Sequence, residues 1–357
     1  MFGDSAHIVF GIALISLGAF IDGGLGLGLK WIRVWRWEHL WMVYSVISFC
    51  FMPWILSFVT VNDLMGVLAA ASGLDIFRVF IFGFGFGFGA VFFGLALKMA
   101  GMGLSYAIAT GLGAAVGSIS PLVLLHREQL FTMQGRIIMG GVLVAVVGVV
   151  FCSWAGHLKD KSAAPAEAAS ASGEVKQWRL DIHVKYGVIA AVLSGLLNPM
   201  INLSFAYGAP LAELAEQRGT LPFLALNVIW AIGMTAGSLV NAAYCAYVIT
   251  RKKTWGLFLP PSRDYVIGLG MGLLGPMGLL LYGVGTWKIG NLGEVIGFPM
   301  LSSMGILSAN LWGAVSGEWA GSGRRPLGFM AIAVVILISA MFILGWSGHL
   351  AEAWERS

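Results

Sequence analysis

Two carboxylates inside long apolar stretches are the residues of this chain best suited to bind a proton. Asp22 lies near the end of the first apolar stretch, beside a run of glycines, and Glu294 begins a later one. An ionised side chain in the hydrocarbon layer of a membrane costs roughly 3 kcal/mol or more, so such a residue is by default a functional candidate. Desolvation favours the neutral form of a carboxyl group, which can then take up and release a proton. We therefore predict Asp22 first, and Glu294 second, as proton-coupling groups; the alternative for both is an interfacial position, which is also our interpretation of Glu318.

Uncharged polar side chains interrupt other apolar stretches. Asn198 and Asn202 flank Pro199 in the middle of the sixth stretch. Proline removes a backbone donor and frees a carbonyl group, and carriers place their binding sites at broken helices near the middle of the membrane. Amide and phenol groups match the hydrogen bonding of hydroxyl groups; the alternative is a proline kink with asparagines that join helices. The residues that we predict to bind substrate are Asn198, Asn202, Tyr207, Phe93, Tyr106, Tyr282 and Asn310.

Glycine alternates with phenylalanine from Phe82 to Gly89. In a soluble protein this period of two would indicate a strand or suggest a phosphate-binding loop. Inside an apolar stretch the backbone must satisfy its own hydrogen bonds, so we predict a helix with two packing pairs, Gly83 with Gly87 and Gly85 with Gly89. The alternative is bare backbone along a substrate path.

The elements that must position these residues are membrane-spanning helices. The 357 residues are 58% hydrophobic and 11% charged, with a mean hydropathy of +0.86. That composition predicts an all-α polytopic membrane protein. Apolar stretches of about twenty residues predict ten transmembrane helices, over 8–29, 38–60, 77–98, 103–125, 135–156, 185–207, 222–250, 264–287, 293–316 and 326–347.

The chain contains an internal repeat. His7 and Gly11 return as His183 and Gly187, an offset of 176 residues, and Gly135-Arg136 returns as Gly323-Arg324. Each half holds five predicted helices, and an odd number inserts the second half upside down relative to the first. Inverted five-helix repeats are typical of transporters. We predict a first repeat over 1–156, a hydrophilic, flexible cytoplasmic linker over 157–184, and a second repeat over 185–357.

Charge in the loops predicts the orientation. The loops that follow the odd-numbered helices hold most of the 21 lysines and arginines, so these loops should be cytoplasmic, Ser172 among them, and both termini outside the inner membrane of a bacterial-type cell. Three unpaired cysteines indicate neither a disulfide nor a metal site, and no motif indicates a cofactor. The pI near 9.0 reflects loop charges rather than a nucleic-acid surface. The oligomeric state stays open.

Several motifs resemble the L-rhamnose–proton symporter family of the drug/metabolite transporter superfamily, and the likeness covers almost the whole chain. The motifs are Lys30 followed by Trp35-x-Trp37-Glu38-x-x-Trp41, Pro53-Trp54, Phe93-Gly-Leu-Ala-Leu-Lys98-x-x-Gly101-Met102, Gly135-Arg136 with Gly141-Val-Leu-Val-Ala, Ala155-Gly156-x-Leu-Lys159, Asn241, and Glu318-Trp319 before Gly323-Arg-Arg-Pro326. From composition alone, the tryptophans near residue 35 would belong to an interfacial aromatic belt, and the arginines would belong to the excess of positive charge on the cytoplasmic side.

The resemblance implies a ten-helix inner-membrane carrier that moves L-rhamnose or a related small neutral sugar inward, across the lipid bilayer, with a proton and by alternating access. The chain departs from the family's founding carrier at Asp22, which replaces a small residue, and at apolar residues in place of polar ones, namely Ala90, Leu279, Leu280 and Leu301. Two alternatives compete: an exporter or exchanger of another small metabolite, and a membrane enzyme. The enzyme would need paired aspartates or a histidine cluster, whereas the six histidines fall at predicted helix ends or in loops, so we do not expect an enzyme.

Overall fold

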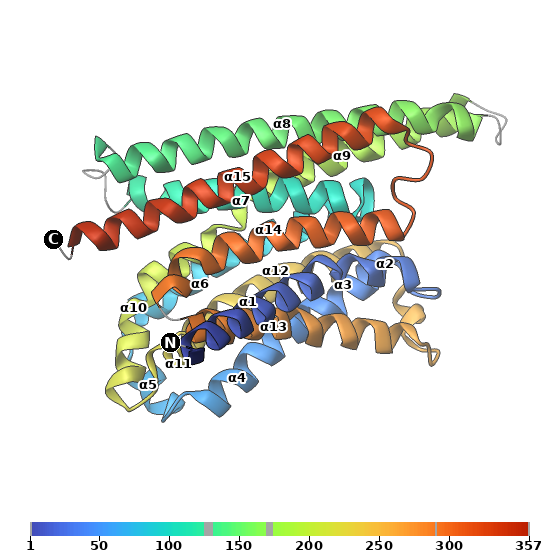
Figure 1. Cartoon of the computed structure of the whole chain (residues 1–357). Helices are drawn as coiled ribbons and strands as arrows, with labels where there is room; N and C mark the ends of the chain where they lie inside the picture. The colour runs from blue at the N-terminus through green and yellow to red at the C-terminus, as the bar shows by residue number, and fades with distance from the viewer. Residues whose placement is uncertain (1, 125–130, 169–173, 290, 356–357) are drawn as a thin grey trace. The chain divides into compact units, whose positions relative to one another are not determined.

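The structure is a computed structural model that describes residues 2–124, 131–168, 174–289 and 291–355, and all regular elements in these ranges are helices (Figure 1). The predicted all-α fold is therefore confirmed for this part of the chain. The α-helices are α1 (Phe2–Gly23), α2 (Gly28–Trp31), α3 (Trp37–Ser45), α4 (Met52–Thr60), α5 (Leu64–Ala70), α6 (Gly73–Ala100), α7 (Met102–Leu124), α8 (Met133–Ala168), α9 (Glu174–Leu197), α10 (Met200–Gln217), α11 (Pro222–Ala225), α12 (Asn227–Arg251), α13 (Asp264–Ile289), α14 (Asn291–Val315) and α15 (Arg324–Glu355).

Eight helical segments of the described residues are long and apolar enough to cross a membrane. They match eight of the ten predicted stretches. The predicted fourth and ninth helices coincide with shorter apolar segments, Met102–Gly117 and Met300–Val315. The described residues thus give a multi-pass membrane protein with eight candidate spans.

Several predicted helices have different internal structure from a single straight helix. A π-helical turn, η2 (Val46–Phe51), separates α3 from α4 inside the predicted second helix. Gly101 has a φ of +85°, a left-handed conformation that favours glycine, and separates α6 from α7. The predicted linker also differs, because α8 continues to Ala168 and α9 begins at Glu174; residues 169–173 lie outside the described residues.

The chain forms two compact units that each combine segments from both halves of the sequence. Unit 1 contains Met1–Leu27, Phe92–Leu196 and Gly278–Ser357, and unit 2 contains Gly28–Val91 and Leu197–Met277. In unit 1, α15 packs along α8 (Figure 1), and α7 and α14 pack on this pair around a core that includes Leu104, Ile306 and Leu337. In unit 2, α4, α5, α10 and α12 surround a core that includes Val67, Leu211 and Ile229.

Glycines on α6 form the two packing seams predicted from the alternating motif. A Cβ atom at Gly83 would lie 2.1 Å from the carbonyl oxygen of Gly233 on α12, and one at Gly87 would lie 2.9 Å from Gly237 Cα. On another face of α6, a Cβ at Gly85 would lie 2.3 Å from the sulfur of Met200. The motif is therefore helical, as predicted, and its glycines permit backbone-to-backbone packing.

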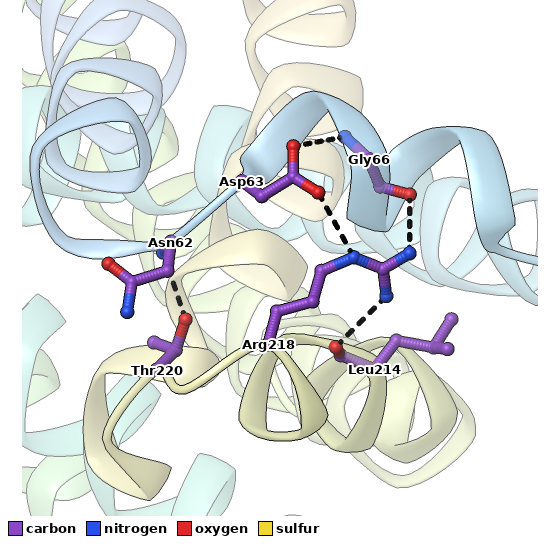
Figure 2. Close-up of polar contacts among 6 residues, drawn as sticks. All are labelled: Asn62, Asp63, Gly66, Leu214, Arg218 and Thr220. Carbon is purple, nitrogen blue, oxygen red and sulfur yellow. Dashed lines mark hydrogen bonds and ion pairs between the residues drawn. The ribbon is translucent and has the colours of Figure 1, made fainter.

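An ion pair and hydrogen bonds connect α5 with the end of α10 in unit 2 (Figure 2). Asp63 adopts a left-handed conformation (φ 49°) and caps α5 by accepting from Gly66 N at 3.2 Å. Arg218 Nε donates to Asp63 Oδ2 at 3.2 Å, and other guanidinium nitrogens donate to the carbonyl oxygens of Gly66 and Leu214 at 3.2 and 3.3 Å. One arginine thus satisfies carbonyl groups on both helices.

Candidate functional site

The first helix of the chain, α1, ends at Gly23, one residue after Asp22. Gly24 N donates to Ile21 O at 3.1 Å, so it does not donate to Phe20 O as an α-helix would require. Two side chains of α14 donate to Phe20 O instead, Ser308 Oγ at 3.0 Å and Trp312 Nε1 at 3.3 Å. The break therefore does not leave the carbonyl group of Phe20 uncompensated, because α14 satisfies it.

Asp22, Tyr106 and Phe93 come together in unit 1. The hydroxyl of Tyr106 on α7 donates a hydrogen bond to the Asp22 carboxylate. Phe93 on α6 meets the ring of Tyr106 edge-on, with centroids 5.8 Å apart. Gly305 on α14 gives the phenol room, since a Cβ there would lie 3.1 Å from Tyr106 Oη. Asp22, predicted to couple protons, thus contacts Tyr106, predicted to bind substrate. The ring of Tyr106 in turn contacts Phe93, which is also predicted to bind substrate.

Two more predicted residues lie on elements of unit 1. Asn310 on α14 donates from Nδ2 to Ile306 O at 2.8 Å. Its Oδ1 faces α7, where a Cβ at Gly103 would lie 2.7 Å away. Tyr282 is half-buried on α13, one turn after Gly278. Glu294 belongs to α14, but its side chain lies outside the described residues.

The remaining predicted residues belong to unit 2. Asn198 and Pro199 form a turn between α9 and α10, and Asn202 N donates to Pro199 O at 2.9 Å, so the predicted break at the proline is confirmed. Asn198 Oδ1 would lie 2.4 Å from a Cβ at Gly89. The side chain of Asn202 is exposed. Tyr207 stacks on Phe82 with centroids 5.2 Å apart.

Three carboxylates that the sequence leaves without a clear role bind partners distant in the chain. Glu318 caps α7, accepting from Met102 N at 2.9 Å. Gly101 precedes α7 and offers no side-chain oxygen, so the cap has to come from another residue, but nothing in the sequence identifies Glu318 as that residue. Asp264 accepts from the backbone amides of residues 33–35 at 2.7 to 3.1 Å. Glu38 is 1% exposed and accepts from Lys252 at 2.9 Å.

The tryptophans of the motif near residue 35 are packed inside unit 2. Trp35, Trp37 and Trp41 are 4%, 5% and 2% exposed, so their interpretation as an interfacial belt is wrong. Trp41 Nε1 donates to Asn241 Oδ1 at 2.9 Å, and Asn241 Nδ2 donates to Gly87 O at 3.1 Å and Gly237 O at 2.8 Å. A buried amide needs such partners, and here it joins α3, α6 and α12.

Comparison with known proteins places this architecture in a family. The family model described as "L-rhamnose-proton symport protein (RhaT)" matches residues 4–349. Proteins named "L-rhamnose-proton symporter" are similar over nearly their full length: that of Enterobacter sp. (strain 638) is 27% identical, covering 95% of this chain and 97% of its own, and that of Cronobacter sakazakii is 26% identical, covering 96% and 98%. That of Citrobacter koseri is 25% identical, covering 96% of this chain and 98% of its own. The chain therefore belongs to the L-rhamnose-proton symport protein (RhaT) family.

Proposed function

We propose that this protein is a secondary active transporter that takes up L-rhamnose or a related small neutral sugar together with protons. The family consists of symport proteins rather than enzymes. The observation that carries the proposal within this chain is the contact of Asp22 with Tyr106, beside the ring of Phe93. A carboxylate and a phenol can hydrogen-bond sugar hydroxyls, and an aromatic face can cover the apolar face of a sugar ring.

Proton coupling follows from the free energy of a buried carboxylate. When Asp22 is ionised, the hydroxyl of Tyr106 donates to it. A sugar hydroxyl that donates to Asp22 would replace this bond, and protonation would remove the charge whose burial costs free energy. The protonated, sugar-loaded carrier is then the form expected to change between outward-facing and inward-facing conformations.

The finer architecture that we propose is ten transmembrane helices in two inverted repeats, 1–156 and 185–357, joined by a cytoplasmic segment 157–184, as in the drug/metabolite transporter superfamily. The repeat offsets and the loop charges support it. The odd-numbered loops would be cytoplasmic and both termini outside. A cysteine in place of Ser172, which lies outside the described residues, should resist an impermeant maleimide in intact cells; labelling from outside would reverse the orientation.

The other substrate-binding residues remain proposals. Tyr282 and Asn310 in unit 1, and Asn198, Asn202 and Tyr207 in unit 2, are proposed to bind sugar hydroxyls, and Glu294 is proposed as a second proton-coupling group. The half-buried position of Tyr282 and the break at Asn198 support their part of the proposal.

The test is transport by the purified protein in proteoliposomes. Sugar counterflow against a panel that includes L-rhamnose, and uptake driven by a pH gradient, should both occur in the wild type. Asp22→Asn should keep counterflow and lose pH-driven accumulation, whereas the exposed Glu216→Gln should behave as wild type. Counterflow with none of the sugars would contradict the proposal and favour the exporter or exchanger.

A further inference from the structure

We infer that Asn198 is the counterpart of Asp22 in the second repeat, and that its amide permanently supplies the neutral form that Asp22 reaches only when protonated. The inference rests on the proposed function for its role in transport. It makes Asn198 a positioning residue for coupling, in addition to any contact with substrate.

The register of the repeat supports this pairing. The offset of 176 residues that relates His7 to His183 and Gly11 to Gly187 relates Asp22 to Asn198. Both positions also lie within one residue of a helix end, since α1 ends at Gly23, one residue after Asp22, and α9 ends at Leu197, one residue before Asn198.

Contacts inside unit 1 repeat with the same register. A Cβ at Gly11 on α1 would lie 2.6 Å from the side chain of Ile289 on α13. A Cβ at Gly187 on α9 would lie 2.9 Å from Met99 Cβ on α6. Met99 and Ile289 are 190 residues apart, the same offset that relates Lys98 to Lys288. The first helix of each half therefore touches the third helix of the other half at equivalent residues.

The side chains of Asp22 and Asn198 also lie near glycines at nearly equivalent positions of the repeat. In unit 1, a Cβ at Gly278 on α13 would lie 3.7 Å from Asp22 Cβ. In unit 2, a Cβ at Gly89 on α6 would lie 2.4 Å from Asn198 Oδ1. The offset of 190 takes residue 89 to residue 279, one position from Gly278. Each side chain thus faces a glycine region of the crossing helix at nearly the same repeat position.

The side chains of Asp22 and Asn198 differ in charge and in hydrogen-bonding capacity only when Asp22 is ionised. A protonated carboxyl and a carboxamide have the same shape and both donate and accept hydrogen bonds, whereas a carboxylate only accepts and carries charge. In a carrier whose two repeats exchange roles between conformations, a charge at one of two equivalent positions favours one conformation. A proton from water that binds the Asp22 carboxylate removes that difference, and its release to water restores it.

Other titratable residues on the helices near Asp22 and Asn198 also contribute to the pH dependence of the unfolding midpoint. Tyr106 is the only Asp, Glu, His, Lys, Arg, Cys or Tyr on α7, and it contacts Asp22 directly. The other titratable residues on α1, α13 and α14 are Asp4, His7, Asp264, Tyr265, Tyr282, Lys288 and Glu294. On α6, α9 and α10, the titratable residues whose side chains the structure describes are Asp75, Arg78, Lys98, Lys185, Tyr186, Tyr207, Glu213 and Glu216.

The test exchanges the two side chains in the full-length protein. Asp22→Asn, Asn198→Asp and the double variant Asp22→Asn/Asn198→Asp are compared with wild type by thermal unfolding midpoint across pH and by pH-driven sugar uptake. Asp22→Asn should flatten the pH dependence of the midpoint, and the double variant should regain it. With one proton per sugar, a gradient of one pH unit supports at most about tenfold accumulation, which Asp22→Asn should lose and the double variant should recover in part.

The outcomes separate the inference from the proposed function. The inference is overturned if the double variant folds but its unfolding midpoint depends on pH as little as that of Asp22→Asn. This holds whatever the protein transports. If the double variant does not fold, Asn198→Asp alone decides, because it should show a stronger pH dependence than wild type, and equal dependence overturns the inference. Asn62→Asp, an exposed change in unit 2, controls for the added carboxylate. Absence of any sugar transport by wild type, with the midpoints as expected, refutes the proposed function and leaves the inference standing.

Discussion

The seam between α6 and α12 allows a prediction whose magnitude follows from the coordinates. A Cβ atom introduced at Gly83 would lie 2.1 Å from the carbonyl oxygen and 2.5 Å from the Cα of Gly233. Both contacts are to backbone, so no side chain can turn away to relieve them. Ordinary contact requires 3.4 Å or more, and α6 and α12 must therefore separate by about 1 Å, as overpacked cores do.

Two effects of opposite sign set the size of the change in stability. Overpacking costs about 1–3 kcal/mol, whereas replacing glycine by alanine inside a helix gains up to about 1 kcal/mol. Gly270 on α13 isolates the second effect, because a Cβ there would meet no atom of the described residues within 4 Å. Gly83→Ala should be destabilised by up to about 3 kcal/mol, and Gly270→Ala should be as stable as wild type or slightly more stable.

The assay is thermal unfolding of the purified variants in one detergent at one heating rate, since membrane proteins commonly unfold irreversibly. Gly83→Ala should unfold below wild type and Gly270→Ala at or above it. Equal midpoints for the two variants would refute the packing argument, because the substitution is the same and only the neighbouring backbone differs.

Three further substitutions test the polar contacts. Glu318→Ala removes the acceptor of the Met102 amide and should cost about 0.5–2 kcal/mol in a detergent melt, more than Glu318→Gln does; an equal loss would show that the cap contributes little. Trp41→Phe leaves the buried Asn241 Oδ1 without its donor and should lower the same midpoint by the equivalent of about 1–3 kcal/mol, and an unchanged midpoint would contradict this. Arg218→Gln breaks an ion pair with Asp63, whose side chain is 63% exposed, so its loss should stay below about 1 kcal/mol and shrink in high salt; a larger, salt-independent loss would mean that the carbonyl contacts dominate.

Local patterns in the sequence predicted the helices and the seams on α6. The hydrophobic stretches specify helices without reference to distant residues, and the spacing of Gly83 and Gly87 specifies one face of a helix. The predicted stretches 103–125 and 293–316 correspond closely to α7 (Met102–Leu124) and α14 (Asn291–Val315). The break at Pro199 was predicted for the same local reason, a missing backbone donor.

The polar partners of distant residues could not be predicted. Glu318 caps a helix that begins 216 residues earlier, and Asp264 accepts from a loop about 230 residues away, so neither pairing leaves a pattern in one sequence. The break after Asp22 has no proline, and its stability depends on Ser308 and Trp312 of α14. The sequence indicated that Asp22 and Tyr106 were candidates, but only the packing of α1 and α7 places them in contact.

The composition of unit 1 has a consequence for biosynthesis. Its first segment ends at Leu27 and its last begins at Gly278, so roughly 250 residues are made between them, which takes about 12–50 s at 5–20 residues per second. During this time α1 is in the membrane without α14, and Phe20 O lacks the two side chains that satisfy it in the folded protein. Tyr106, the partner of Asp22, is made 84 residues after it. The backbone at the end of α1 is therefore completed late, and the nascent chain must tolerate an unsatisfied carbonyl group at Phe20 in lipid until α14 has been made.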